Sequence, residues 1–126
     1  LPVKKKQPAR KILPLTLFVI KKDEQSALGK RADKGLLAGM YEIPNTDGHL
    51  DEKECKVYLE KLGYGVLQIE KLPDAKHIFT HLEWQMQAYL VTVTATKPVH
   101  TFYDRNELQN LPLPGAFAAY RKYILE

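Results

Sequence analysis

Residues 35–44 of this chain read GLLAGMYEIP, and this stretch decides the fold. Gly35 and Gly39 enclose a short apolar run, and glycine readily adopts the positive φ angles of tight turns. The stretch then passes through aromatic, acidic and aliphatic residues to Pro44, which has no N–H to donate to a sheet. The pattern predicts a loop that leads into a short strand ending at Pro44. Because no Lys-Ser/Thr of a phosphate-binding loop follows, we interpret both glycines as turn formers.

Alternating apolar residues predict a set of strands around this loop. Residues 12–20 carry Leu13, Leu15, Leu17 and Val19 on one face, which is the pattern of a central strand. Further strands are expected over residues 27–31, 66–70, 77–82 and 85–95. The first two strands form a predicted hairpin, and the last two form a longer pair.

Two or three helices are expected between and after the strands. Apolar residues recur at helical spacing over residues 51–62, with Asp51 as a natural N-cap and Gly63 as a natural stop. A short capped helix is predicted from Asp104, and residues 114–125 are predicted to close the chain as a helix. Strands joined by both hairpins and helical crossovers indicate an α/β fold, an α/β/α sandwich with a mixed sheet.

Length and composition limit the function classes. The 126 residues suffice for one domain, which would bury about two-thirds of its unfolded surface. The single cysteine, Cys55, excludes an internal disulfide and a cysteine-based metal or iron–sulfur site, and its helical pattern predicts a buried thiol. No apolar run approaches the ~20 residues that cross a bilayer, so we expect no membrane partner. A cytoplasmic or otherwise intracellular location is expected.

Positive charge is concentrated at the start of the chain. Residues 1–34 hold ten Lys and Arg against three acidic residues, a charge of +7, and the total of +4 leaves −3 for the rest. The opening LPVKKKQPAR cannot build a core, so residues 1–11 are predicted to be a basic arm or linker, and residues 12–126 a single domain. We expect the chain to be part of a longer protein. A positive front suits a polyanionic partner, although a solvated tail would look the same.

A second stretch, residues 76–84, reads KHIFTHLEW and places Phe79, Thr80 and His81 side by side between apolar residues. In this order and spacing, the two stretches resemble the C-terminal domain of the A/G-specific adenine DNA glycosylases, the MutY family. The resemblance extends from LPVKKK, similar to the basic tail of the family's interdomain connector, to LPLPGAFAAYRKYI, and it is weakest over residues 45–72. It implies a Nudix-like α/β/α sandwich that inspects 8-oxoguanine opposite a misplaced adenine.

The resemblance also implies a parent enzyme and its partners. The parent would be an adenine DNA glycosylase of base-excision repair, an N-glycosyl hydrolase. It would be associated with the nucleoid in the cytoplasm of a bacterium, or otherwise intracellular. Its partners would be double-stranded DNA with 8-oxoguanine:adenine mispairs and its own N-terminal catalytic domain. In the family that missing domain holds the catalytic glutamate and an iron–sulfur cluster. We therefore expect no catalytic residue and no cofactor in this chain.

The resemblance assigns lesion recognition to Phe79, Thr80 and His81. The family usually has Phe-Ser-His here, so Thr80 takes the position of the serine. Oxidation turns guanine N7 from an acceptor into a donor and adds a carbonyl at C8, and a hydroxyl can bond to either group. Phe79 is open to two interpretations, a wedge against bases or a core anchor. His81 could reach a phosphate or a base edge, or bond only to backbone.

Nudix hydrolases hold magnesium with glutamates of the helix motif R-E-x-x-E-E-x-G. With its glycine aligned on Gly63, this chain has Lys56 for the arginine, and Val57, Glu60 and Lys61 for the three glutamates. A valine and a lysine cannot ligate a metal, so no metal site is expected. The alternative is a free-standing Nudix hydrolase of oxidised nucleotides. A third interpretation is a protein-interaction module whose basic arm is only a linker.

Basic residues are the candidates for sequence-independent contacts with phosphates. The predicted contacts are Lys4, Lys5, Lys6, Arg10, Lys11, Lys30 and Arg31, and Lys34 could extend the track.

Overall fold

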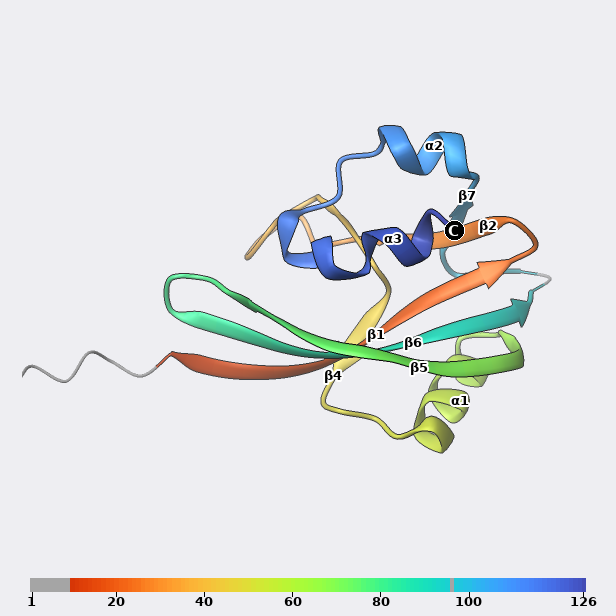
Figure 1. Ribbon diagram of the computed structural model, residues 1–126, viewed down its shortest axis with the longest axis horizontal. Coiled ribbons are helices and arrows are strands. Elements are labelled where there is room, and N and C mark those ends of the chain that lie inside the picture. Colours follow the sequence, from red (N-terminus) through yellow and green to blue (C-terminus); the bar gives the residue numbers. More distant parts are fainter. Residues whose placement is uncertain (1–9, 96) are drawn as a thin grey trace, which may run out of the picture.

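The computed structural model describes residues 10–95 and 97–126. Within these residues, seven strands form a sheet in the order β3-β2-β1-β6-β5, with β4 paired to β1 and β7 paired to β2 (Figure 1). The strands are β1 (Lys11–Lys22), β2 (Gln25–Lys30), β3 (Tyr41–Glu42), β4 (Asn45–Asp47), β5 (Gly65–Ile78), β6 (Leu82–Thr94) and β7 (Thr101–Tyr103). The helices are α1 (Glu52–Lys61), α2 (Arg105–Asn110), a 3₁₀ helix (Gly115–Tyr120) and α3 (Arg121–Ile124).

Strand β1 lies at the centre of the sheet. It pairs in parallel with β6, from Lys11 opposite Leu82 to Lys21 opposite Thr92, whereas the other strand pairs are antiparallel. Six consecutive residues of β1, 15–20, are buried, because both faces of the strand are covered. The sheet is therefore mixed, as the sequence predicts.

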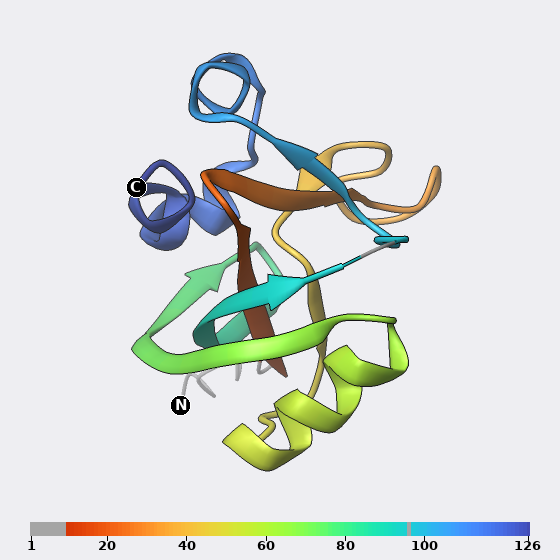
Figure 2. The same cartoon turned by 90° about the vertical axis from the view of Figure 1, so that its right-hand side faces the viewer.

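The helices cover opposite faces of the sheet, so the predicted layered α/β architecture is confirmed. Figure 2 shows α1 beneath the sheet and the C-terminal helices above it. The upper core includes Trp84, Phe117 and Tyr120. The lower core includes Phe18 and Cys55. Burial raises the pKa of the Cys55 thiol to about 12, and the negative charge of the nearby Asp51 adds to this effect. The thiol is therefore unreactive and buried, and the burial was predicted from the sequence.

Both predicted helix caps are present. The Asp51 side chain accepts from the Glu54 amide, and the Glu54 side chain accepts from the Asp51 amide. Asp104 and Glu107 make the same reciprocal pair at the start of α2. Such capping boxes satisfy amide groups that the first helical turn leaves without partners.

The long hairpin β5–β6 differs from its predicted form. The strands expected over residues 66–70 and 77–82 are one strand, β5, which continues past an irregularity between Leu72 and Ala75. Pro73 lies in that irregularity, where its missing N–H costs no ladder hydrogen bond. The hairpin turns at residues 79–81, so Leu82 and the residues after it already belong to β6. The predicted strands over residues 77–82 and 85–95 put this turn too late, because residues 79–81 contain no typical turn-forming residue.

The C-terminal helix is also only partly as predicted. Residues 115–120 form a 3₁₀ helix that changes into α3 at Arg121. The amide of Phe117 bonds to the carbonyl of Pro114 at 3.0 Å, the i to i+3 bond of the tighter helix. The apolar residues that helical spacing places on one side of this segment, Phe117, Tyr120 and Ile124, are nevertheless buried together. Among the described helices, none is long and apolar enough to cross a bilayer.

The segment between β4 and α1 is held by one buried hydroxyl. Thr16 Oγ1 donates to the carbonyl of Gly48 at 2.8 Å and accepts from the amide of Leu50 at 2.9 Å. Thr16 is fully buried in β1. This residue therefore fixes where the chain leaves the sheet to begin α1.

Replacing Thr16 by valine keeps the shape of the side chain and removes both hydrogen bonds. Because two backbone groups lose their partner, Thr16→Val is expected to lower the free energy of unfolding by about 1–3 kcal/mol. Urea denaturation measures this value. Thr92→Val on β6 is the matched control, since its side chain is only half-buried. Equal, small effects of both substitutions would contradict the role of Thr16.

Candidate functional site

The turn that joins β5 to β6 lies at one end of the molecule, on the left in Figure 1. The amide of Phe79 donates to the carbonyl of Leu82 at 2.7 Å and closes the turn. Thr80 and His81 occupy its tip and are exposed. The amide of Lys11 donates to the carbonyl of His81 at 3.1 Å, which places the start of β1 beside the turn. The Thr80 hydroxyl is therefore accessible from solvent.

Phe79 anchors this turn to the upper core. Its half-buried ring meets the rings of His77 and Trp84 edge to face, with centroids 4.7 and 5.1 Å away. Of the two interpretations of Phe79, the geometry favours the core anchor. His77 and Phe79 lie on the same side of the hairpin, where their rings meet. His81 does not continue this row of side chains, because β5 ends at Ile78.

Trp84 connects the turn to the rest of the domain. Trp84 is 1% exposed, and the centroid of its ring lies 5.6 Å from that of Phe117, so Trp84 is a packing residue of the upper core. The guanidinium carbon of Arg31 lies 5.2 Å from the centroid of the same ring, within the range of a cation–π contact. The buried indole N–H has no hydrogen-bond partner among the described residues. Ring contacts are therefore what hold Trp84 in place.

Arg31 brings the loop of residues 31–40 onto Trp84. Its Nε donates to the carbonyl of Leu36 at 2.9 Å, and one terminal nitrogen donates to Glu42 Oε1 at 3.0 Å. Gly35 and Gly39 have φ angles of +95° and +69°, as expected for turn formers. Arg31 thus links the two stretches singled out in the sequence, since it bonds to Leu36 and Glu42 of the first and lies over Trp84 of the second.

The basic residues near the turn differ in how they are engaged. Arg10 forms an ion pair with Glu83 at 3.3 Å. A hydrogen bond from Gln85 lowers the pKa of the Glu83 carboxyl, burial opposes this, and Arg10 and Lys76 lower it further. This carboxylate therefore stays ionised and holds Arg10 against the sheet.

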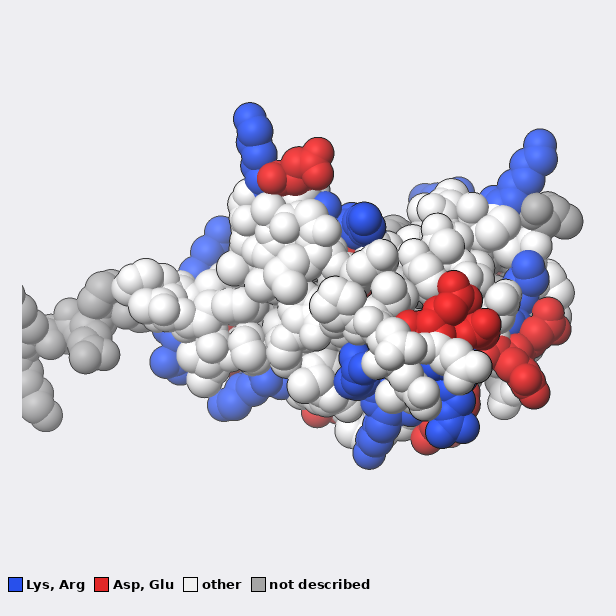
Figure 3. All heavy atoms as spheres, turned by 90° about the horizontal axis from the view of Figure 1, so that it is seen from above, with Lys and Arg blue, Asp and Glu red and all other residues white. Residues whose placement is uncertain are grey.

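The predicted phosphate contacts fall into three groups. Lys4, Lys5 and Lys6 lie outside the described residues. Arg10, Lys11 and Lys30 are exposed, and blue side chains gather around the end of the molecule where the grey residues begin (Figure 3). Arg31 is half-buried and uses two of its nitrogens within the domain, so its phosphate role stays a prediction. Lys11 is already part of β1, so the sheet begins one residue earlier than predicted.

The residues of α1 do not form the carboxylate set that magnesium requires. Val57 is 51% exposed, and Lys56 forms an ion pair with Glu60 at 3.9 Å. Lys61 ends the helix. Among residues 10–95 and 97–126, no group of three or more His, Cys, Asp or Glu side chains could hold a metal ion. The metal chemistry implied by the fold therefore does not fit these residues.

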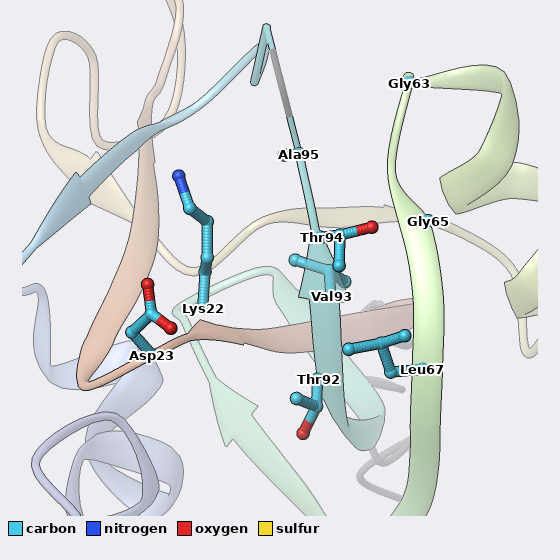
Figure 4. A pocket seen from close by; sticks show the side chains of 9 residues that line it. All are labelled: Lys22, Asp23, Gly63, Gly65, Leu67, Thr92, Val93, Thr94 and Ala95. Atoms are coloured by element: carbon cyan, nitrogen blue, oxygen red, sulfur yellow. The ribbon is translucent and has the colours of Figure 1, made fainter.

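A hollow of about 550 Å³ lies at the other end of the sheet (Figure 4). Lys22 and Asp23 line one side of it, and Gly63 and Gly65 line another. A second hollow runs alongside α1. The sequence signals neither hollow. The first joins residues from segments far apart in the chain, and the second, within residues 46–61, depends on how the chain turns from β4 into α1. Neither contains Phe79, Thr80 or His81.

Solved structures of the same fold include a MUTYH C-terminal domain, a MutT protein and a NUDIX hydrolase. The C-terminal domain of mouse MUTYH, solved in complex with human PCNA, matches with a TM-score of 0.73 and 19% identity, over 88% of this chain and 86% of that chain. A MutT structure described for Aliivibrio salmonicida and Vibrio cholerae matches with a TM-score of 0.63 and 20% identity, over 91% and 98%. A NUDIX hydrolase from Nitrosomonas europaea matches with a TM-score of 0.64 and 14% identity, over 90% and 88%.

At these identities the structural matches show the fold. The family model of the NUDIX domain matches residues 16–123, which include most of the sheet, α1 and the C-terminal helices. The chain therefore belongs to the NUDIX domain family.

Proposed function

We propose that this chain is the lesion-recognition domain of an adenine DNA glycosylase and that it inspects 8-oxoguanine opposite adenine in double-stranded DNA. The observation that carries the proposal is the exposed Thr80 hydroxyl at the tip of a turn anchored by Phe79. The higher TM-score with the MUTYH C-terminal domain than with the two hydrolases supports it. So does the presence of Val57 and Lys61 at positions where a hydrolase needs carboxylates.

The Thr80 hydroxyl can distinguish the oxidised base from guanine. It can accept a hydrogen bond from the N7–H of 8-oxoguanine or donate one to its C8 carbonyl, whereas guanine N7 is only an acceptor. One such bond contributes about 0.5–1.5 kcal/mol net, which corresponds to roughly two- to tenfold discrimination. Thr80 therefore supplies part of the selectivity.

Phosphate contacts would position the turn on the duplex. Arg10, Lys11 and Lys30 are exposed, and each contact with a phosphate adds affinity that does not depend on sequence. In this proposal, the N-terminal catalytic domain, with its iron–sulfur cluster, extrudes the adenine into its own pocket while this domain holds the opposite strand. The domain itself contributes binding and orientation.

The hydroxyl of Thr80 is tested by a substitution that keeps the shape of the side chain. With this chain joined to the catalytic domain of an adenine DNA glycosylase, the ratio of adenine removal opposite 8-oxoguanine to removal opposite guanine is measured. Thr80→Val is expected to lower that ratio roughly two- to tenfold, since one hydrogen bond is lost. The ratio comes from single-turnover rates on the two duplexes.

Thr80→Ser is the matched control, because it keeps the hydroxyl and restores the residue usual in the family. It should leave the ratio close to that of the unmodified chain. Both variants should unfold at the same urea concentration, as Thr80 is exposed. An unchanged ratio in Thr80→Val would remove Thr80 from the recognition site.

The link between Arg31 and Trp84 is tested by its effect on the turn. Lysine has no planar guanidinium to lie over the indole and no rigid fork of N–H groups to span the Leu36 carbonyl and Glu42, so Arg31→Lys should release the loop of residues 31–40 from Trp84. Trp84 is the only tryptophan, so a red shift of its fluorescence reports the loss directly. Stability should fall by about 1 kcal/mol in urea denaturation. Lys34→Gln, at an exposed position of the same loop, is the control, and identical spectra for both variants would disprove the link.

A nucleotide hydrolase is the second candidate, favoured by the structural matches to MutT and NUDIX hydrolases. Because Val57 and Lys61 cannot ligate magnesium, this chain is expected to release no pyrophosphate from 8-oxo-dGTP in the presence of Mg²⁺. Release is measured with a pyrophosphate-coupled assay, with a MutT enzyme as the positive control. Magnesium-dependent release abolished by Glu60→Gln would establish the hydrolase instead.

A further inference from the structure

The second hollow is a groove between α1 and the segment that leads into it. Its volume is about 410 Å³. Helix α1, which supplies most of its lining, lies on the lower side of the sheet and away from the turn between β5 and β6 (Figure 1). Thr46 and Leu50 form one wall. Lys53, Val57 and Lys61 line the other, together with Tyr58. This is the side of α1 on which the aligned Nudix motif would place two of its metal-binding glutamates.

The wall formed by α1 is a stripe of one apolar and two cationic side chains. Lys53, Val57 and Lys61 are spaced by four residues, so they lie along one side of the helix, with the two lysines about 12 Å apart along its axis. Val57 is 51% exposed between them. Neither lysine belongs to an ion pair within the described residues. The stripe thus offers two cations and an apolar contact.

Glu54, the acidic residue in the groove, is already engaged. Its Oε1 accepts from the Asp51 amide at 3.1 Å in the capping box of α1. A capping carboxylate is held over the first turn of the helix and is not free to pair with the lysines. The two lysines outnumber Glu54, so the net charge of the groove is positive.

Hydrogen bonds and ring contacts fix both walls. The hydroxyl of Tyr89 donates to the carbonyl of Leu50 at 2.9 Å, and the Thr16 hydroxyl bonds to Leu50 from the other side. The ring of Tyr58 stacks on Phe18 with centroids 5.3 Å apart. Because these contacts already fix the shape of the groove, it loses little conformational entropy when a partner binds.

We propose that this groove binds an acidic segment of a partner protein, with one apolar side chain between two carboxylates. The carboxylates would pair with Lys53 and Lys61, and the apolar side chain would cover Val57 and contact Leu50. An extended chain spans ~12 Å in about four residues, so the two acidic residues would be about four positions apart. Nucleic acid fits less well, because a phosphate backbone would be set against Val57, Leu50 and Tyr58 and would gain no hydrogen bond from them.

The proposal is tested with a displayed library of random twelve-residue peptides selected on the immobilised chain. The selected peptides are expected to carry two acidic residues about four positions apart with an apolar residue between them. The double variant Lys53→Gln and Lys61→Gln should bind these peptides about tenfold more weakly, and Val57→Ser should also weaken binding. Lys56→Gln is the matched control, because Lys56 is exposed on the same helix but does not line the groove.

The binding site is located by ¹⁵N NMR with one selected peptide, a 20-base-pair duplex and Mg²⁺ in separate titrations. The proposal predicts shifts of the amides of α1 and Leu50 with the peptide, and none there with the duplex or with Mg²⁺. Peptides without the acidic pattern, equal binding by the double variant, or no enrichment would overturn it. Shifts of α1 by the duplex would assign the groove to nucleic acid, and shifts by Mg²⁺ would assign it to a metal, so either result would also overturn it.

Discussion

The packing of Trp84 holds together the end of the domain that carries the Thr80 turn. This one ring contacts Phe79 from the turn, Phe117 from the C-terminal helices and Arg31 from the loop of residues 31–40. Each contact is modest, since cation–π and aromatic pairs contribute about 0.5–2 kcal/mol, but together they join three segments that are far apart in the chain. The position of Thr80 at the tip depends on this packing, because Phe79 is the residue of the turn whose ring packs against the upper core, and on the backbone bond from Lys11 to His81.

The structure also explains how a Nudix scaffold can persist without the glutamates of its hydrolytic motif. The stability of α1 comes from its inward side, where Cys55 and Leu59 are fully buried in the lower core. The capping box of Asp51 and Glu54 satisfies its first turn. Neither feature uses the positions that align with metal ligands, so Val57 and Lys61 can occupy them at little cost to folding. The chemistry of the helix is thus independent of its structural role.

Much of the fold could be predicted from the sequence, because its signals are local. The central strand, α1 with its cap, and α2 with its cap follow from periodicity and capping residues within a dozen positions. The hairpin turn was placed wrongly because residues 77–84 contain no Gly, Pro, Asn or Asp to mark it, and only pairing across strands fixes the register. The contact of Arg31 with Trp84 could not be predicted, since tertiary packing brings the two residues together. The groove beside α1 lies within residues 46–61, but its shape depends on the angle at which the chain turns from β4 into the helix.

The exposure of Thr80 limits how much lesion selectivity one residue can provide. A hydroxyl at a solvent-exposed tip has water to bond with before DNA arrives, so its gain on binding is the net value of a hydrogen bond, about 0.5–1.5 kcal/mol. In the proposed function, a larger effect requires that the turn become buried against the duplex, where a hydroxyl oxygen held as an acceptor and facing guanine N7 leaves two acceptors unsatisfied. The neighbouring cations Arg10 and Lys11 can press the turn onto the backbone in this way. In the proposed function, selectivity is therefore a joint property of the hydroxyl, the rigid anchor of Phe79 on Trp84, and the charge around them.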